Sequence, residues 1–294
     1  MKYCIITDQI SLDLEEALKD AKKHNYKYVE LHDVMQKSIE ECNEEELQEI
    51  KRLLAKYGMQ VANISSTVFF LCPLYENDQV SLFNDVFFAP NTTYEEHLRN
   101  LDNACHIAKE LNCPNVRIFP FRFPDNRKGP YGTEEHMERI ITRFKEAVKI
   151  AEKHDVTLVV ENCPYSHLPK GKMTLKVVQA INNPHLRLLW DPANSYRAIK
   201  DNVPEEYLHD SLMEELEAVY PYIGHIHIKN YRYNPTLVKP FEHVEVFDGD
   251  IDFKEMLSVL KEKQCDKYLS LEAEVDYQQT INSMDDFKAY IDQM

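Results

Sequence analysis

The chain has 294 residues, of which 44% are hydrophobic and 29% charged, so it can bury a large core and does not resemble a disordered chain. Its 50 acidic residues outnumber 34 basic ones, and the net charge of -16 would repel a phosphate backbone, which argues against nucleic acid as a partner. Seven scattered cysteines without a C-x-x-C pair indicate reduced thiols rather than a disulfide framework or a structural zinc site.

The first residues contain no apolar segment of the kind found in signal peptides, and no run of about 18 apolar residues follows. We therefore expect a cytoplasmic protein with no membrane partner.

Eight short apolar runs recur along the chain, each followed by residues at helical spacing. Residues 3–6 precede a helix that Ser11 would cap, and residues 28–31 precede a helix at 44–56 that Gly58 would end. Further strands are predicted at 60–64, 116–119, 156–160, 186–190, 223–228 and 268–271. Further helices are predicted at 94–111, 134–154, 174–181, 214–219, 253–263 and 283–293.

This alternation predicts an α/β fold with a parallel sheet, since parallel strands need crossover connections and are buried on both faces. Eight units can close into a (β/α)8 barrel, whose usual size of roughly 250 residues suits one domain spanning 1–294. An open doubly wound sheet is the alternative. It is disfavoured because no glycine-rich loop follows the first strand and the chain has six glycines in all.

Two long insertions, at 68–91 and 231–250, follow the third and seventh strands. Barrel enzymes build and cover their sites with such loops, so we expect both insertions to act as lids. The alternative is a contact between subunits, which would make the protein a homo-oligomer, a dimer or a tetramer. The apolar side chains of the first insertion are Phe69, Phe70, Leu71, Leu74, Phe87 and Phe88.

The last four strands end in groups that bind metals: Glu161, Asp191, His227 and Glu272. Separations of 30, 36 and 45 positions correspond to about one βα unit each, which would bring these groups together at one mouth of the barrel. Any one of these carboxylates could instead cap the following helix. Three carboxylates and an imidazole form a hard donor set, for which we expect one divalent cation, with Mn²⁺ preferred and Mg²⁺, Co²⁺ or Zn²⁺ compatible.

His225 lies two positions before His227 and therefore points to the same face of its strand. Because it is one layer deeper in the barrel, we expect it to be either a hydrogen-bonding partner of the site or a buried core residue.

The strand ends LVVEN, LLWDPAN, GHIHIKN and LSLEAE, together with FDGDIDF, VELHD and VRIFPFR, resemble the sugar phosphate isomerase/epimerase family of the xylose-isomerase-like TIM barrels. The resemblance spans most of the chain. It implies that Glu161, Asp191, His227 and Glu272 bind one divalent cation and that the two glutamates also move protons.

Type IV apurinic endonucleases share this barrel but bind three zinc ions through additional histidines. The resemblance to them is incomplete, because Asn194 stands where one of those histidines is expected and no aspartate-x-histidine pair follows the seventh strand. Ser65, Ser66 and Phe119 occupy further positions near which histidines are expected.

These residues predict a metal-dependent isomerase or epimerase acting on a sugar, sugar phosphate or sugar acid through an enediolate. Glu161 and Glu272 would transfer protons on opposite faces of the substrate. The alternatives are a lyase of the inosose dehydratase type and a non-catalytic sugar-binding barrel. Candidate substrate-binding residues are Lys229, Arg122, Asn162, Asn194 and His167.

Each of these candidate residues could instead have a purely structural role. Lys229 could donate to a substrate oxygen or pair with a neighbouring carboxylate. Asn162 and Asn194 could bind hydroxyl groups or cap helices. Of Arg117 and Arg122, we expect Arg122 to bind a phosphate or carboxylate of the substrate.

Overall fold

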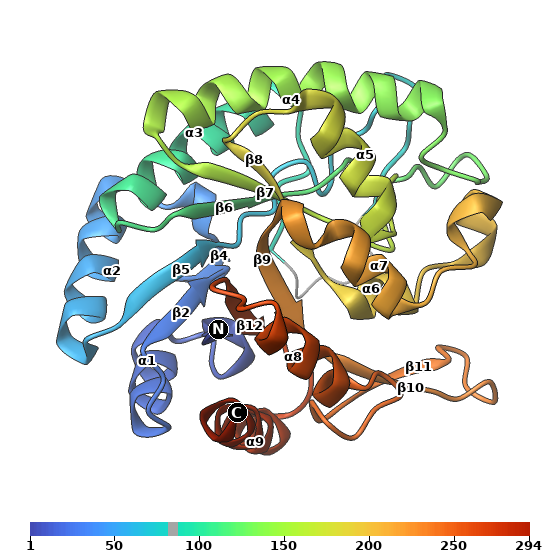
Figure 1. Cartoon of the computed structure of the whole chain (residues 1–294). Coiled ribbons are helices and arrows are strands. Elements are labelled where there is room, and N and C mark those ends of the chain that lie inside the picture. Colours follow the sequence, from blue (N-terminus) through green and yellow to red (C-terminus); the bar gives the residue numbers. More distant parts are fainter. Residues whose placement is uncertain (82–87) are drawn as a thin grey trace.

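A ring of parallel strands, each leading into a helix or a helix-bearing loop, organises the chain (Figure 1). The computed structural model describes residues 1–81 and 88–294, so the predicted lid residue Phe87 lies outside the described residues. In the described chain, eight strands close into a barrel in the order β1-β12-β9-β8-β7-β6-β5-β2. They are β1 (Lys2–Ile6), β2 (Tyr28–Leu31), β5 (Gln60–Ile64), β6 (Asn115–Ile118), β7 (Thr157–Glu161), β8 (Leu186–Trp190), β9 (Ile223–Ile228) and β12 (Tyr268–Leu271).

The predicted (β/α)8 barrel is confirmed. The helices that surround it are α1 (Leu14–Lys23), α2 (Glu44–Tyr57), α3 (Tyr94–Glu110), α4 (Glu134–His154), α5 (Gly171–Ile181), α6 (Pro192–Tyr196), α7 (Leu212–Val219), α8 (Phe253–Glu262) and α9 (Tyr277–Gln293). Among the described residues, no helix is both long and apolar enough to cross a membrane.

The sequence predicted one helix end correctly and one helix start incorrectly. Gly58 ends α2 in the left-handed conformation at φ 68°, as expected, since glycine adopts this conformation without strain. The prediction that Ser11 caps α1 was wrong. Asp13 accepts the Glu16 amide hydrogen, while the Ser11 hydroxyl accepts the amide hydrogen of Asp13.

Several strands turn polar side chains into the barrel and apolar ones toward the helices. In β9, His225 and His227 alternate with Ile226 and Ile228, and all four are buried. The interior of this barrel is therefore a polar network over β1, β2, β9 and β12, while the apolar core lies between strands and helices.

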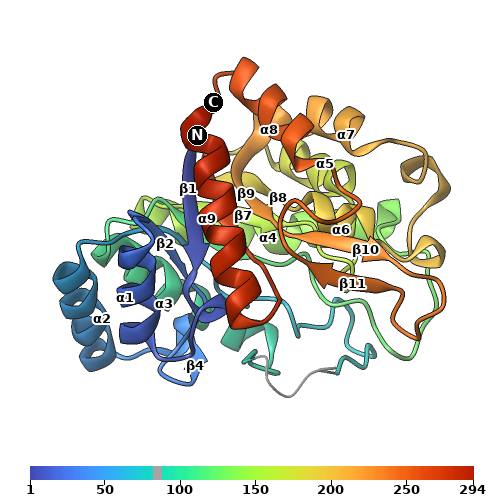
Figure 2. The ribbon, with the colours of Figure 1, turned by 90° about the horizontal axis from the view of Figure 1, so that it is seen from below.

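The insertion after β9 folds back on itself as an antiparallel hairpin of β10 (Asn230–Tyr233) and β11 (Phe241–Val244). A second, shorter hairpin of β3 (Asp33–Val34) and β4 (Lys37–Ser38) follows β2. Figure 2 shows both hairpins on the side of the barrel opposite the two chain ends, which lie close together. This is the side at which the barrel strands end.

The insertion after β5 does not act as a single lid. Phe69 stacks on Phe121 with ring centres 4.9 Å apart and belongs to the main core, as does Leu74, so the lid prediction was wrong for these two residues. Phe70 and Leu71 instead join a separate apolar cluster with Phe119, the residue that follows β6. Among the described residues of this segment, Phe70 and Leu71 thus pack beside the end of β6.

Candidate metal centre

Four side chains that the sequence placed at successive strand ends converge in the structure. Glu161 ends β7, Asp191 follows β8, His227 lies in β9 and Glu272 follows β12, and these four strands are neighbours around the barrel. One ligand atom from each lies within 4.8 Å of the others. Asp191 and His227 are fully buried, and the Glu272 side chain is 12% exposed, so the cluster reaches the surface on the side of Glu272.

The ring of His227 is oriented for a metal ligand. Its Nε2 lies 2.9 Å from Oε1 of Glu30, while Nδ1 faces Oε2 of Glu272 at 3.3 Å and forms no hydrogen bond in the described chain. If Nε2–H donates to Glu30, the lone pair of Nδ1 points at the carboxylates. An unsatisfied nitrogen beside three carboxylates fits a divalent cation, held by His227, Glu161, Asp191 and Glu272.

Glu30 organises the barrel interior beneath this centre. Its Oε1 also accepts from Asn63 Nδ2 at 2.9 Å, and its Oε2 accepts from the Ser270 hydroxyl at 2.5 Å and faces His225 Nε2 at 2.8 Å. Burial alone would raise the pKa of Glu30, but the two imidazoles outweigh it and hold this pKa well below its usual range.

Glu30 was not among the site residues predicted from the sequence. The signal available was a glutamate in the otherwise apolar strand YVEL, facing inward. His225 is thus a hydrogen-bonding partner of the network, one of the two roles expected for it.

Glu161 is held by two donors, one from strand β6 and one from helix α6. Arg117 Nη1 lies 3.1 Å from Oε2, and Asn194 Nδ2 donates to Oε1 at 2.9 Å. The other guanidinium hydrogens of Arg117 bond the carbonyl oxygens of Ser65 and Ser66, so this arginine is fixed within the protein. Burial raises the pKa of Glu161 despite the nearby guanidinium.

Lys229 places its ammonium among the carboxylates. Its Nζ lies 2.5 Å from Oε2 of Glu272 and 3.0 Å from Oδ2 of Asp191, so the ion pair left open by the sequence is formed. Burial would raise the pKa of Glu272, but the charges of Lys229 and His227 outweigh it and hold this pKa well below its usual range. Contact between Lys229 and a substrate stays a prediction.

The two asparagines brace the turn after β8. Asn162 Oδ1 accepts the Asp191 amide hydrogen at 2.9 Å, and Asn162 Nδ2 donates to the Asp191 carbonyl at 2.8 Å. Asn194 donates to Glu161 and to the Asn162 carbonyl. Both amides therefore position carboxylates of the candidate metal centre, and their binding of substrate hydroxyl groups stays a prediction.

The other two candidate substrate residues lie near the ends of β6 and β7. Arg122 donates to the Tyr165 carbonyl at 3.0 Å, and its guanidinium lies over the Tyr165 ring at 5.4 Å. His167 is fully buried, with its ring 5.3 Å from that of Tyr131 and 4.7 Å from that of His136. These contacts do not join His167 to the four convergent groups, and its contact with substrate stays a prediction.

A second cluster of titratable groups follows β1 and β2. His32 Nδ1 lies 3.1 Å from Oδ2 of Asp8 and 3.5 Å from Oδ1 of Asp33. Burial is the main cause that raises the pKa of Asp33 to about 6. The sequence analysis did not identify this cluster, which lies at the same end of the barrel as the metal centre.

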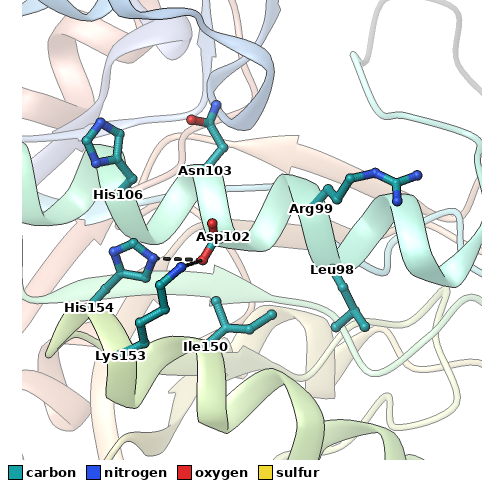
Figure 3. A pocket seen from close by; sticks show the side chains of 8 residues that line it. All are labelled: Leu98, Arg99, Asp102, Asn103, His106, Ile150, Lys153 and His154. Atoms are coloured by element: carbon teal, nitrogen blue, oxygen red, sulfur yellow. Dashed lines mark hydrogen bonds and ion pairs between the residues drawn. The ribbon is translucent and has the colours of Figure 1, made fainter.

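A groove of about 620 Å³ on the outside of the barrel lies between α3 and α4 and is separate from the metal centre. Figure 3 shows Asp102 of α3 facing Lys153 and His154 of α4 across it. Its lining consists of helix residues that face away from the strands, and the groove is wide open to solvent. It contains none of the groups that converge at the strand ends.

The sequence and the fold of this chain are similar to those of known barrel proteins. A family model described as "Xylose isomerase-like TIM barrel" matches residues 18–292. A curated relative, the inosose dehydratase of Yersinia enterocolitica, is 25% identical over 162 residues, which cover 50% of this chain and 51% of the relative. The match thus spans about half the length of that protein.

Solved structures share the whole fold at low identity. The 3-keto-D-glucoside 4-epimerase YcjR of E. coli has a TM-score of 0.67 at 13% identity and covers 100% of both chains. A xylose isomerase-like protein of Mycobacterium smegmatis in complex with magnesium has a TM-score of 0.67 at 13% identity, covering 94% of this chain and 87% of that one. The IOLI protein with a bound zinc atom has a TM-score of 0.66 at 16% identity and covers 100% of this chain and 99% of its own.

Proposed function

The chain belongs to the xylose isomerase-like TIM barrel family, and on that premise we propose that it is a divalent-metal-dependent isomerase or epimerase acting on a sugar next to its carbonyl group. Sugar-modifying neighbours support an enzyme of this general kind. The single observation that carries the proposal is the convergence of Glu161, Asp191, His227 and Glu272 within 4.8 Å.

A bound cation would polarise the carbonyl group and offset the negative charge that develops on neighbouring substrate oxygens. Hard oxygen donors predominate in the set, and this is the reason Mn²⁺ remains our first expectation. Mg²⁺ and Zn²⁺ are alternatives, because two solved structures of similar fold are described with magnesium and with zinc.

The proposal assigns proton transfer to the two glutamates, which come from different strands. Glu161 comes from β7 and Glu272 from the end of β12, with β8 and β9 between them in the barrel. Arg117 and Asn194 fix the carboxylate of Glu161, while Lys229 fixes that of Glu272. One carboxylate would remove a carbon-bound proton, and the other would return a proton to the opposite face.

The two environments separate the pKa values of these carboxyl groups. Burial raises the pKa of Glu161, and the ammonium of Lys229 overcomes burial to lower that of Glu272. Such a separation is common where two carboxyl groups take different acid and base roles.

A lyase of the dehydratase type is a second candidate function, because the curated relative is named an inosose dehydratase. The same base would remove the proton, and the other carboxyl group would protonate a departing β-hydroxyl.

The experiment that tests the proposal is a panel of sugars, sugar acids and sugar phosphates incubated with the Mn²⁺-loaded protein in deuterated water, followed by NMR and mass spectrometry. An isomerase or epimerase conserves the composition of the substrate and exchanges a carbon-bound hydrogen for deuterium. A dehydratase yields a product lighter by one water. Absence of both exchange and product over the whole panel would contradict the proposed activity.

A further inference from the structure

Arg197 occupies an unusual position beside the metal centre. It follows α6, six residues after Asp191, and its guanidinium carbon lies 4.9 Å from the ring centre of Tyr165 and 5.0 Å from that of Tyr231. Two aromatic faces therefore hold the guanidinium, an arrangement that favours a cation and restricts its motion.

Among the described residues, no carboxylate forms an ion pair with this guanidinium, and Glu274 acts on it only from a longer distance. Within residues 1–81 and 88–294, no hydrogen bond or ion pair is formed by the Arg197 side chain, and its Nε is buried without an acceptor. By contrast, Arg117 meets the carboxylate of Glu161, and its remaining donors meet carbonyl oxygens. Buried donors are nearly always satisfied in folded proteins, so the unmet Nε donor of the half-buried Arg197 indicates an acceptor that the described chain does not supply.

Both rings that flank Arg197 connect to the metal centre. Tyr165 lies four residues after Glu161 in the loop that leaves β7. The Tyr231 hydroxyl lies 3.5 Å from Oε2 of Glu274, and Oε1 of Glu274 lies 4.0 Å from Nζ of Lys229. One layer of side chains therefore separates Arg197 from the groups that surround the metal.

The same ring of Tyr165 also contacts Arg122, whose guanidinium carbon lies 5.4 Å from its centre. Two guanidinium groups thus flank one aromatic ring at the strand ends of a protein whose net charge is -16. Asp125 lies 3.9 Å from Arg122 and offsets part of its charge, but the two guanidinium groups together favour an anionic group there over a neutral one.

We propose that Arg197 binds an anionic group of the substrate, a carboxylate or a phosphate, at the end of the substrate opposite the reacting carbonyl. Planar guanidinium groups bind such oxyanions through two parallel N–H donors, which also sets the orientation of the bound molecule. This inference rests on the proposed function for the identity of the substrate as a sugar derivative. An anion-binding Arg197 would limit the class of substrate to sugar acids and sugar phosphates.

The test is calorimetric binding of three unreactive probes to the Mn²⁺-loaded protein: D-gluconate, D-sorbitol 6-phosphate and neutral D-sorbitol. Because none of them has a carbonyl group, binding is measured without turnover, and the result does not depend on the proposed reaction. The wild type should bind one of the two anions at least tenfold more tightly than sorbitol, and the preferred anion identifies carboxylate or phosphate. Arg197→Gln should weaken binding of that anion by roughly ten- to a hundredfold, the usual effect of losing a hydrogen bond to a charged group.

Matched variants separate recognition from structure. Arg197→Lys, which keeps the charge but loses the planar pair of donors, should retain part of the preference. Arg232→Gln should leave it unchanged, because Arg232 is exposed and donates to the Asp248 carbonyl in the β10–β11 region. Anion preference that survives in Arg197→Gln, or its absence in the wild type, would overturn the proposal. An equal loss of sorbitol binding would assign Arg197 a purely structural role and would overturn it as well.

Discussion

The Nε2 atom of His227 lies 2.9 Å from Oε1 of Glu30, a buried carboxylate of β2 beneath the other three metal-binding candidates. This contact fixes the orientation of the ring and leaves Nδ1 as the atom that faces Glu272. Partners that orient a metal-binding histidine contribute strongly to metal affinity. Glu30 is therefore as much a part of the proposed centre as the residues that would touch the ion.

Replacing Glu30 with Gln should weaken Mn²⁺ binding by about 10- to 100-fold, because the amide keeps the shape of the side chain but loses the charge that orients His227. Calorimetric titration of the folded variant with Mn²⁺ measures this change. Glu40→Gln is the matched control, since Glu40 is also buried and hydrogen-bonded but contacts Ser38 and Thr67 instead. Equal Mn²⁺ affinity in the wild type and Glu30→Gln would show that the contact has no role in metal binding.

Lys229→Met should destabilise the metal-free protein by about 3–5 kcal/mol, because it leaves the buried carboxylates of Asp191 and Glu272 without their cation. Saturating Mn²⁺ should restore more stability to this variant than to the wild type, since the ion then compensates the same carboxylates. Urea unfolding with and without Mn²⁺ measures both effects.

Lys263→Met provides the comparison, because its pair with Glu217 at 2.8 Å lies at the surface and should be worth less than about 1 kcal/mol. If Mn²⁺ stabilises Lys229→Met no more than it stabilises the wild type, the ion and Lys229 do not neutralise the same carboxylates.

His97 should make the fold sensitive to acid. The ring is fully buried, its Nδ1 accepts the amide hydrogen of Phe69, and burial lowers its pKa to about 4 from the usual 6.5. Because the folded-state pKa lies below the unfolded value, its stabilising contribution is complete above pH 6.5 and is lost as the pH falls toward 4, by up to about 3 kcal/mol.

His97→Gln keeps an acceptor for Phe69 but does not titrate. The difference in unfolding free energy between pH 7 and pH 4.5 should therefore be smaller in this variant than in the wild type, and His106→Gln on the exposed face of α3 should behave like the wild type. Parallel pH profiles for His97→Gln and the wild type, measured by urea unfolding, would refute this role of His97.

Glu161→Gln and Glu272→Gln should each retain the fold and lower kcat by about 10²–10⁴, the usual contribution of a general acid or base. Steady-state rates on the substrate identified in the sugar panel measure this loss. Glu146→Gln, on α4 where it accepts from the Tyr94 hydroxyl, should leave the rate unchanged. Full activity in either barrel variant would exclude a mechanism with two bases.

Local sequence patterns predicted the barrel and the convergence of four strand ends, because alternation within a strand fixes which side chains face the interior. The same patterns could not select Glu30, since its role depends on the closure of the barrel, which brings β2 opposite β9 across the interior. The contacts of Lys229 were undecided for a similar reason. An inward-facing lysine meets a carboxylate or a substrate depending on distances that only the folded barrel determines.

Two local predictions were wrong because they depended on where a helix begins and on which residues pack together in the fold. Asp13 and not Ser11 caps α1 because the helix begins at Leu14, and Asp13 is the residue directly before it. Phe69 adopts a positive φ of 66° and turns into the core against Phe121, which removes it from the covering segment. Hydrophobicity alone does not distinguish a core residue from one that covers a site.

Metal content is the measurement that tests the central claim most directly. After dialysis against Mn²⁺ and removal of free ion, mass spectrometry of the wild-type protein should find one ion per chain, and the Asp191→Asn/His227→Gln double variant should hold none. A wild-type chain that retains no ion, or a double variant that retains as much as the wild type, would contradict a metal centre at the ends of β7, β8, β9 and β12.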